Sequence, residues 1–290
     1  MDIKKIFSNQ RTIVIAALVL ICIAFAAITP DKFLQVTTFT NIAKSAYYVA
    51  FMAIGVTFVI GTGGIDLSIG TIAICSALIG GTLMEKGVPM GIVLLVILLS
   101  GALFGLINGL MVAKMGLPAF IATLGTMMMS RGLGSIVSGT KTISFPQGDS
   151  AGSWFREFFM ITKDGGILPK NFPTGFVLLA VIAVIMALIL NKTKTGRYIL
   201  SIGSNKEATR LSGINVVKYE TLAYVFSGLF AALAGGVGTI LGTIVGVFIM
   251  TVLKIGFPYI GVQSHYQLFI TGIILIFAVY MDVLNRKRGK

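Results

Sequence analysis

Long stretches without a charged residue constrain this chain more than any other feature. One such stretch runs from Leu222 to Leu253, and another runs from Met90 to Val112. A helix needs about 20 mainly apolar residues to cross the hydrocarbon core of a bilayer. With 56% hydrophobic and 11% charged residues, the chain also has too few charges to cover a soluble globule of 290 residues. We therefore predict an all-α fold, a polytopic bundle of membrane-spanning helices.

Positive charge is concentrated in short segments between the apolar runs. The net charge is +13, but the lysines and arginines are not spread along one face as in a nucleic-acid-binding protein. Lys4, Lys5 and Arg11 precede the first run, and residues 285–290 form a basic tail. Because such clusters mark cytoplasmic segments, we expect both termini in the cytoplasm. No Ala-x-Ala site precedes Pro30, so we expect the first run to stay as a span rather than to be removed as a signal peptide.

The apolar runs predict about eight crossings within a single transmembrane domain, residues 1–290. Two cytoplasmic termini require an even number of crossings. The run over residues 222–253 is too long for one span and too short for two, so we count it as one crossing with an overhang or a re-entrant piece. The expected crossings cover approximately residues 12–29, 46–61, 68–83, 90–112, 119–137, 174–190, 222–253 and 267–283.

The stretch from Gly61 to Thr71 places a carboxylate and several glycines between two of these crossings. A carboxylate persists in or near hydrocarbon only where it caps a helix end, faces the bundle interior or lines a pathway. The glycines favour the end of one helix, and Asp66 or Ser68 is suited to cap the next. The stretch predicts a discontinuous helix pair, with Asp66 as a cap or as an ion-coupling site.

Glycines recur every four residues in two of the crossings. Gly101, Gly105 and Gly109 form one series, and residues 238, 242 and 246 form another. Small residues at this spacing let the backbones of membrane helices approach closely. We interpret both series as helix-packing surfaces.

The polar stretch over residues 138–170 contains the only tryptophan of the chain, Trp154. Aromatic and charged residues mix from Trp154 to Met160, which is typical of a short helix lying at the membrane interface. We favour an aromatic anchor at the interface over a contact with a partner.

The sequence offers no pattern typical of an enzyme. It contains no phosphate-binding Gly-x4-Gly-Lys-Ser/Thr loop and no dinucleotide fingerprint. Apart from Asp66, the carboxylates lie in loops or at the ends of crossings, so no buried acid pair is expected. We therefore expect no catalytic residue, no metal site and no cofactor.

Residues 191–218 form the most basic loop of the chain and are expected in the cytoplasm. Within this loop a short helix is predicted, with Asn205 as its N-cap, Glu207 in its first turn, Arg210 near its end and Gly213 as its stop. Such a helix either docks into a groove of a soluble partner or is simply solvated. Its residues are Asn205, Lys206, Glu207, Ala208, Thr209, Arg210, Leu211, Ser212 and Gly213.

Three segments carry a resemblance to a known family. Residues Gly63–Gly70, Gly116–Met127 and Asn205–Ile214 resemble, in order and separation, the permease subunits of ribose-type sugar ABC importers. The resemblance covers nearly the whole chain. It implies a homodimeric or heterodimeric permease in the bacterial inner (plasma) membrane, which takes a small sugar from an extracytoplasmic sugar-binding protein. It also implies that two cytoplasmic ABC ATPase domains power transport and dock on the coupling helix at Asn205–Gly213.

The chain departs from this family pattern at one point. In the family, a sequence like Ala231–Gly235 is separated from a glycine-rich Gly-Gly-x-Gly-Thr-Ile segment, whereas here Gly235 runs directly into Gly236. The resemblance therefore implies an internal deletion near Gly235 and Gly236. We expect this loss to impair transport unless a partner permease compensates.

Two other functions remain open from the sequence. One is an ABC permease for another small solute, such as branched-chain amino acids, and the other is an ion-coupled secondary carrier that uses Asp66. In any of these transporters, polar side chains expected along the translocation pathway are Asp66, Ser68, Asn108, Thr123 and Thr126. We expect sugar specificity to lie mainly in the separate binding protein.

Overall fold

The computed structural model describes residues 10–141, 143, 145, 175–234, 251–263, 266, 267, 269, 270 and 273. The chain divides into two compact units, of which one comprises residues 1–46 and 241–290 and the other residues 47–240. The described residues form helices and connecting turns and contain no strand. The all-α prediction is therefore confirmed, and the single domain over residues 1–290 stays a prediction.

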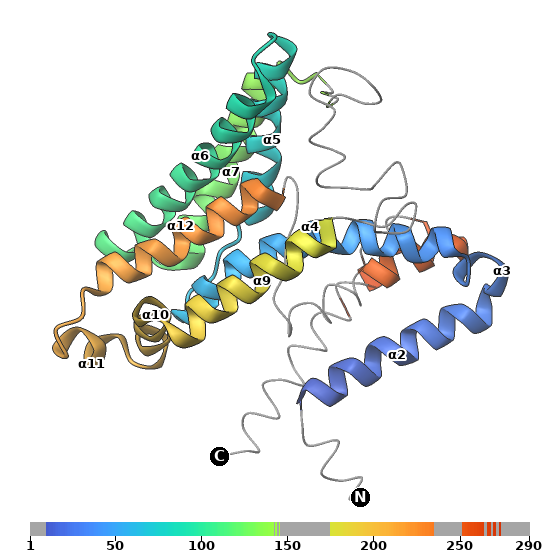
Figure 1. The fold of residues 1–290 in the computed structure, drawn as a ribbon, viewed down its shortest axis with the longest axis horizontal. Coiled ribbons are helices and arrows are strands. Elements are labelled where there is room, and N and C mark those ends of the chain that lie inside the picture. The colour runs from blue at the N-terminus through green and yellow to red at the C-terminus, as the bar shows by residue number, and fades with distance from the viewer. Residues whose placement is uncertain are drawn as a thin grey trace, which may run out of the picture. The chain divides into compact units, whose positions relative to one another are not determined.

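The described helices match most of the expected crossings and are labelled in Figure 1. Their bounds are α2 (Gln10–Ile28), α3 (Pro30–Phe33), α4 (Val36–Gly61), α5 (Ile69–Glu85), α6 (Met90–Gly109), the π-helical turn η1 (Leu110–Lys114), α7 (Ala119–Ser138), α9 (Gly175–Lys192), α10 (Lys194–Ser204), α11 (Lys206–Leu211) and α12 (Val216–Ala234). Residues 251–259 are also helical.

Several of these helices are long and apolar enough to cross a membrane. Among the described residues there are four, or up to five if the bent pair α9 and α10 forms one span. The four are Val36–Gly61, Met90–Lys114, Ala119–Ser138 and Val216–Ala234, and two shorter apolar helices cover Ile15–Ile28 and Ile69–Glu85. The polytopic helical bundle is confirmed, whereas the full count of eight includes ranges outside the described residues.

Two helices begin earlier than the sequence predicts. Helix α4 starts at Val36, ten residues before the expected crossing, and α12 starts at Val216, six residues before the charge-free run. Asn215 supports the second start because its side-chain oxygen accepts the backbone N–H of Lys218, 3.0 Å away. Lys218 therefore lies in the first turn of α12 and not in the basic loop. The apolar runs placed both helix starts too late, because a helix can extend into polar residues beyond its apolar run.

The unit formed by residues 1–46 and 241–290 is held by aromatic contacts. The Phe25 ring stacks on Phe33 with centroids 5.6 Å apart and meets Phe257 edge-on at 6.0 Å. The hydroxyls of Thr38 and Tyr259 lie 2.9 Å apart and share a hydrogen bond. These contacts join α2, α3 and the start of α4 to the helical residues 251–259.

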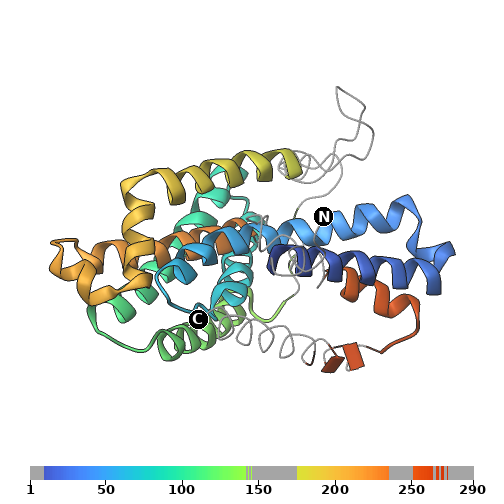
Figure 2. The same cartoon turned by 90° about the horizontal axis from the view of Figure 1, so that it is seen from below.

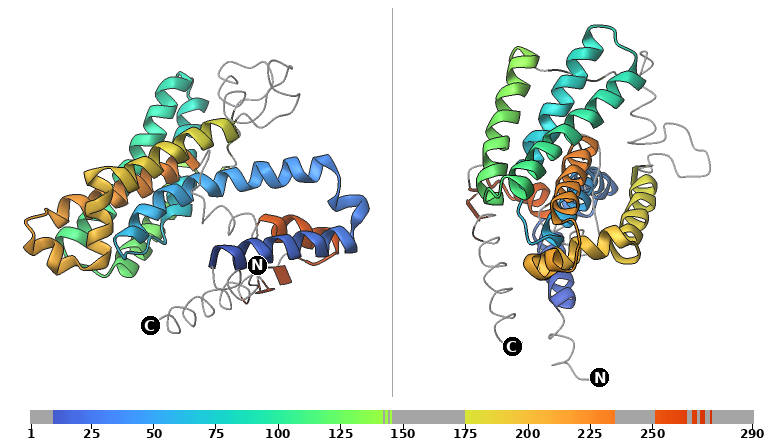
Figure 3. Two further views of the ribbon diagram at one scale, coloured as in Figure 1. Left: turned by 60° about the horizontal axis from the view of Figure 1, so that its bottom comes forward. Right: turned by 90° about the vertical axis from the view of Figure 1, so that its left-hand side faces the viewer.

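In the unit of residues 47–240, helix α12 packs against α6 over nearly its whole length, the most extensive contact among the described helices. Helices α5, α6 and α7 run side by side next to it (Figure 3). Gly101, Gly105 and Gly109 of α6 all face α12, and a Cβ on Gly105 would collide with the carbonyl oxygen of Tyr224. The predicted packing role of this glycine series is confirmed.

Three other predictions fall outside the described residues. They are the interfacial helix at Trp154–Met160, the second glycine series at residues 238, 242 and 246, and the deletion junction at Gly235 and Gly236. The boundary between the two compact units, between Ile240 and Leu241, falls a few residues after that junction in the sequence.

Candidate functional site

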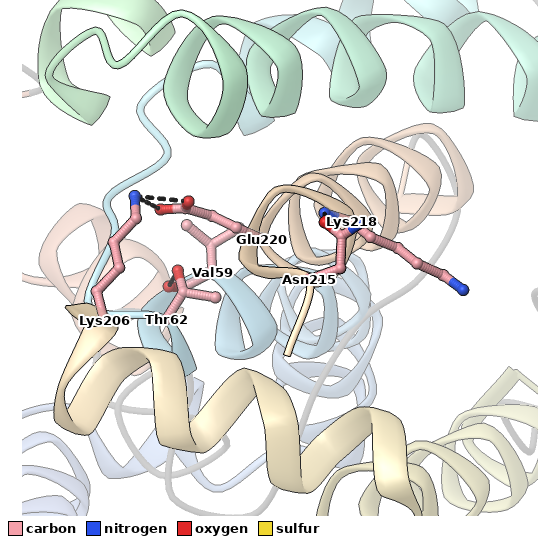
Figure 4. Close-up of polar contacts among 6 residues, drawn as sticks. All are labelled: Val59, Thr62, Lys206, Asn215, Lys218 and Glu220. Atoms are coloured by element: carbon pink, nitrogen blue, oxygen red, sulfur yellow. Dashed lines mark hydrogen bonds and ion pairs between the residues drawn. The ribbon is translucent and has the colours of Figure 1, made fainter. Parts of the chain in front are cut away.

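The connection between α4 and α5 forms the predicted discontinuity. Helix α4 ends at Gly61 and α5 begins at Ile69. Gly63 adopts a φ of 79°, a left-handed conformation that glycine tolerates and other residues rarely adopt. The Thr62 hydroxyl donates to the carbonyl oxygen of Val59 at 2.7 Å and satisfies one of the last carbonyls of α4 (Figure 4).

Asp66 is buried at this connection and accepts hydrogen bonds from two segments. Its Oδ1 atom accepts from the Ser68 backbone N–H at 2.9 Å and from the Ser68 hydroxyl at 2.6 Å. Its Oδ2 atom accepts from the Ser227 hydroxyl of α12 at 2.6 Å. The Ser68 hydroxyl in turn accepts from Nδ2 of Asn108 on α6 at 2.8 Å. One carboxylate therefore ties the start of α5 to α6 and α12.

This geometry corrects the predicted capping of α5. Ser68 occupies the N-cap position, but its side chain accepts no bond from the α5 backbone. The hydroxyl instead points to Asp66, because a short bond to a buried carboxylate is stronger than a bond to a neutral N–H. Asp66 accepts the backbone N–H of the N-cap residue Ser68. It therefore acts as a brace before α5 and not as the N-cap of α5.

The other predicted pathway residues are also buried. Asn108, Thr123 and Thr126 have no exposed surface within the chain. The Thr123 hydroxyl donates to the carbonyl oxygen of Ala119 in its own helix at 2.8 Å. Two polar atoms, Oδ1 of Asn108 and Oγ1 of Thr126, have no hydrogen-bond partner. The structure joins Asp66, Ser68 and Asn108 in one network, and Thr123 and Thr126 are not bonded to it.

The basic loop contains two short helices where the sequence predicts one. Helix α10 follows α9 at an angle of 65°, and Figure 2 shows this bend. Thr193 caps α10 by accepting the Gly196 N–H at 3.3 Å. The amphipathic pattern Tyr198, Ile199, Ile202 beside Arg197 and Ser201 was the sequence signal for this helix, and the loop assignment overlooked it.

The predicted end signals of α11 are confirmed. Asn205 accepts the Ala208 N–H at 2.9 Å, and Gly213 has a φ of 79° after the last turn. Glu207 and Arg210 form an exposed ion pair at 3.0 Å. Leu211 is 83% exposed, so the helix presents an apolar side chain outward.

Lys206 connects α11 to α12. Its Nζ atom lies 2.9 Å from Oε1 and 2.7 Å from Oε2 of Glu220, so both carboxylate oxygens meet the ammonium group (Figure 4). Glu220 is buried, whereas about half of the Lys206 side chain is exposed. Nothing in the sequence singles out Glu220, because its ion pair depends on a residue 14 positions away.

The loop and the α4–α5 connection also meet directly. A Cβ on Gly203 of α10 would collide with the carbonyl oxygen of Gly61, so the two backbones are in close contact. Figure 1 shows the connection after α4 beside α10. Two features that are far apart in the sequence therefore lie at the same end of this unit. Within the described residues, no cluster of three or more His, Cys, Asp or Glu side chains is arranged to hold a metal ion.

Comparison with known proteins places the chain in a family. Residues 38–237 match the family model described as "Branched-chain amino acid transport system / permease component". The chain belongs to this permease family. No solved structure matches it.

Relatives of the permease extend over almost the whole chain. The galactose/methyl galactoside import permease protein of Escherichia coli is 31% identical over 324 residues, covering 95% of each chain. The ribose import permease protein of Escherichia coli is 30% identical over 320 residues, covering 98% of this chain and 96% of the relative. The fructose import permease protein of Rhizobium meliloti is 31% identical over 316 residues, covering 97% and 87%.

These alignments also contain positions that the permease lacks. Since 98% of 290 residues is about 284, about 36 of the 320 positions aligned with the ribose permease have no counterpart here. The same arithmetic for the Escherichia coli galactoside permease, with about 276 residues in 324 positions, gives about 48. The family match ends at residue 237, next to Gly235 and Gly236. The alignments agree with an internal loss relative to these relatives, and its place near Gly235 and Gly236 stays a prediction.

Proposed function

We propose that the chain is the transmembrane permease subunit of an ATP-driven sugar importer, an ABC transporter of the ribose type. Its role is to pass a small sugar from an extracytoplasmic binding protein through a permease dimer. The observation that carries this proposal is the match, over nearly the full length, to import permeases named for ribose, galactose and fructose. These names favour a sugar over branched-chain amino acids, although the family description names the latter.

ATP hydrolysis is assigned to a separate cytoplasmic ABC ATPase subunit, so the permease itself is not an enzyme. Residues 205–213 dock on that subunit as the coupling helix. The exposed ion pair of Glu207 and Arg210 and the protruding Leu211 support this role, because they offer a partner both charge and apolar surface.

The proposed membrane orientation follows the positive charges. The basic loop around α10 and α11 lies in the cytoplasm, together with both termini, in the bacterial inner membrane. The α4–α5 connection then lies at the cytoplasmic end of the bundle, because it contacts α10 through Gly61 and Gly203.

Within the pathway set of Asp66, Ser68, Asn108, Thr123 and Thr126, the two residues with unbonded polar atoms are the best candidates for contact with sugar. Asn108 Oδ1 and Thr126 Oγ1 are buried and unpartnered, a state that costs free energy unless a passing hydroxyl or water bonds to them. Asp66 and Ser68 already accept hydrogen bonds from protein donors, so they serve mainly to hold the helices that line the path.

The proposal is tested by uptake of labelled sugar in cells. The cells lack their own sugar permeases and carry this chain together with an ABC ATPase and a sugar-binding protein from the same source. Uptake of labelled ribose, galactose or fructose, lost when the ATPase phosphate-loop lysine is replaced, supports the proposal. Uptake of labelled leucine instead of any sugar would favour the amino-acid importer.

A second strain tests the effect of the missing segment. It carries a version of the chain in which the segment after Gly235 is restored from the Escherichia coli ribose permease. We expect faster uptake by the restored version, because the loss removes membrane-embedded structure. Equal rates in the two strains would refute impaired transport.

A further inference from the structure

Glu220 is a buried carboxylate, and the ammonium group of Lys206 is its ion-pair partner. It lies near the start of α12, and both of its oxygens face Nζ of Lys206 on α11. Removing one member of a buried ion pair leaves an uncompensated charge, which makes such a contact hard to break. The ion pair therefore joins α11 to α12, with its carboxylate side chain buried and its lysine side chain half exposed.

The same face of α12 contacts the α4–α5 connection further along. Glu220, Tyr224 and Ser227 are spaced by four and three residues, which places them on one side of a helix. The Tyr224 hydroxyl donates to the carbonyl oxygen of Ile65 at 3.4 Å, and the Ser227 hydroxyl donates to Asp66 at 2.6 Å. One helical face therefore joins the coupling helix to the Asp66 network.

A second contact joins the loop to the connection without α12. Gly203, near the end of α10, packs against the Gly61 backbone, and a Cβ at Gly203 would collide with the Gly61 carbonyl oxygen. Ile199 of α10 is fully buried next to Gly61. The connection is thus held by α10 on one side and by α12 on the other.

We propose that the Lys206–Glu220 ion pair makes the α4–α5 connection move with the coupling helix, and we call this pair the strut. The Gly203–Gly61 contact is the point about which the connection turns. Glu220 is a positioning residue, since it acts on the pathway end through Tyr224, Ser227 and Asp66. This inference rests on the proposed function, because it requires an ATPase that moves α11.

Cysteine labelling of the connection tests the strut. Leu67, which is 39% exposed and lies between Asp66 and Ser68, is changed to Cys in a chain whose Cys22 and Cys75 are replaced by Ala. The maleimide labelling rate is measured in membranes with the associated ATPase, once with ADP and once trapped with ATP and vanadate. We expect the two rates to differ by roughly fivefold or more, the lower end of usual coupling between sites.

The variants Glu220→Gln and Lys206→Met should reduce this difference to less than about twofold, since coupling free energy passes through the pair. The exchanged pair Lys206→Glu with Glu220→Lys should restore it. Lys218→Met is the matched control, because Lys218 lies in the same part of α12 and its side chain points away from Glu220 (Figure 4). It should leave the difference unchanged.

Each outcome separates the strut from the proposed function. If the wild-type chain does not retain the ATPase on purification, the proposed function fails and the strut fails with it. If the ATPase is retained but the wild-type rates are equal, or if Lys206→Met keeps the full difference, the strut alone is overturned. A folded, ATPase-bound exchanged pair without restored response overturns it as well. Thermal unfolding of each variant shows whether a lost response reflects a lost fold.

Discussion

Helix α12 is held by two faces that work differently. Toward α6 it meets Gly101, Gly105 and Gly109, and its own Gly228 fits against the α6 backbone without a side chain between them. Toward the basic loop and the α4–α5 connection it presents Glu220, Tyr224 and Ser227, whose side chains form specific polar bonds. The contact with α6 depends on the absence of side chains between the two backbones. The contact with the loop and the α4–α5 connection depends on hydrogen bonds and an ion pair.

The difference indicates separate roles for the two faces. A glycine contact gains its stability from close backbone packing, so it tolerates no added atom and has no alternative arrangement. Hydrogen bonds and ion pairs between side chains keep a fixed partner while allowing small displacements. We therefore assign the α6–α12 contact to the rigid frame of the permease and the polar face to the transmission of motion.

The largest effect is expected from filling the glycine face. Gly228→Leu should prevent folding or destabilise the protein by more than about 4 kcal/mol, because the side chain would displace the α6 backbone at Gly101 and Gly105. Thermal unfolding in detergent measures this effect. Gly132→Leu on α7, where a Cβ has open space, is the control and should unfold near the wild-type temperature. A stable Gly228→Leu variant would contradict the rigid-frame assignment.

A smaller but distinct effect is expected at the polar face. Asp66→Ala leaves the Ser68 N–H and the Ser227 hydroxyl without their acceptor and should destabilise by about 3 kcal/mol. Asp66→Asn keeps one acceptor oxygen, and the serine hydroxyls reorient toward its amide, so the expected loss is about 1 kcal/mol.

Sugar uptake by the Asp66→Asn variant distinguishes a brace from an ion-coupling site. We expect uptake to persist at a reduced rate, because an amide replaces most of the hydrogen bonds. Complete loss of uptake in a variant with near-normal thermal stability would instead favour a carrier that uses the carboxylate charge.

The smallest effect is expected at the cap of α11. Asn205→Ala removes the acceptor of the Ala208 N–H and should destabilise the chain by about 1 kcal/mol, and Asn205→Asp should restore stability. The informative readout is the affinity for the ATPase subunit, measured by titration in detergent. We expect Asn205→Ala to weaken it and Asn205→Asp to recover it. An unchanged affinity would argue against docking through α11.

The sequence predicted features that depend on neighbouring residues. The end of α4 at Gly61, the start of α7 at Ala119 and the cap of α11 at Asn205 follow from local backbone preferences, and the structure confirms them. The glycine series of α6 predicted close packing because its spacing defines one helix face.

Features that depend on tertiary contacts were not accessible from the sequence. The partner of the glycine series, α12, begins more than 100 residues later, and nothing in the series identifies it. Ser227 and Glu220 look like ordinary polar residues near an apolar helix until the fold brings them to Asp66 and Lys206. The role of Asp66 as a brace was not predicted for the same reason, since one of its donors, the Ser227 hydroxyl, comes from a helix that only the fold brings beside it.

Sugar transport by purified components tests the central claim most directly. The chain is reconstituted into proteoliposomes with its ATPase, with ATP enclosed on the ATPase side and the sugar-loaded binding protein on the other. The account predicts accumulation of labelled sugar on the ATPase side that requires ATP, the binding protein and this chain, at a rate below that of the version with the restored segment. Accumulation that persists without ATPase but follows an imposed proton or sodium gradient would contradict it.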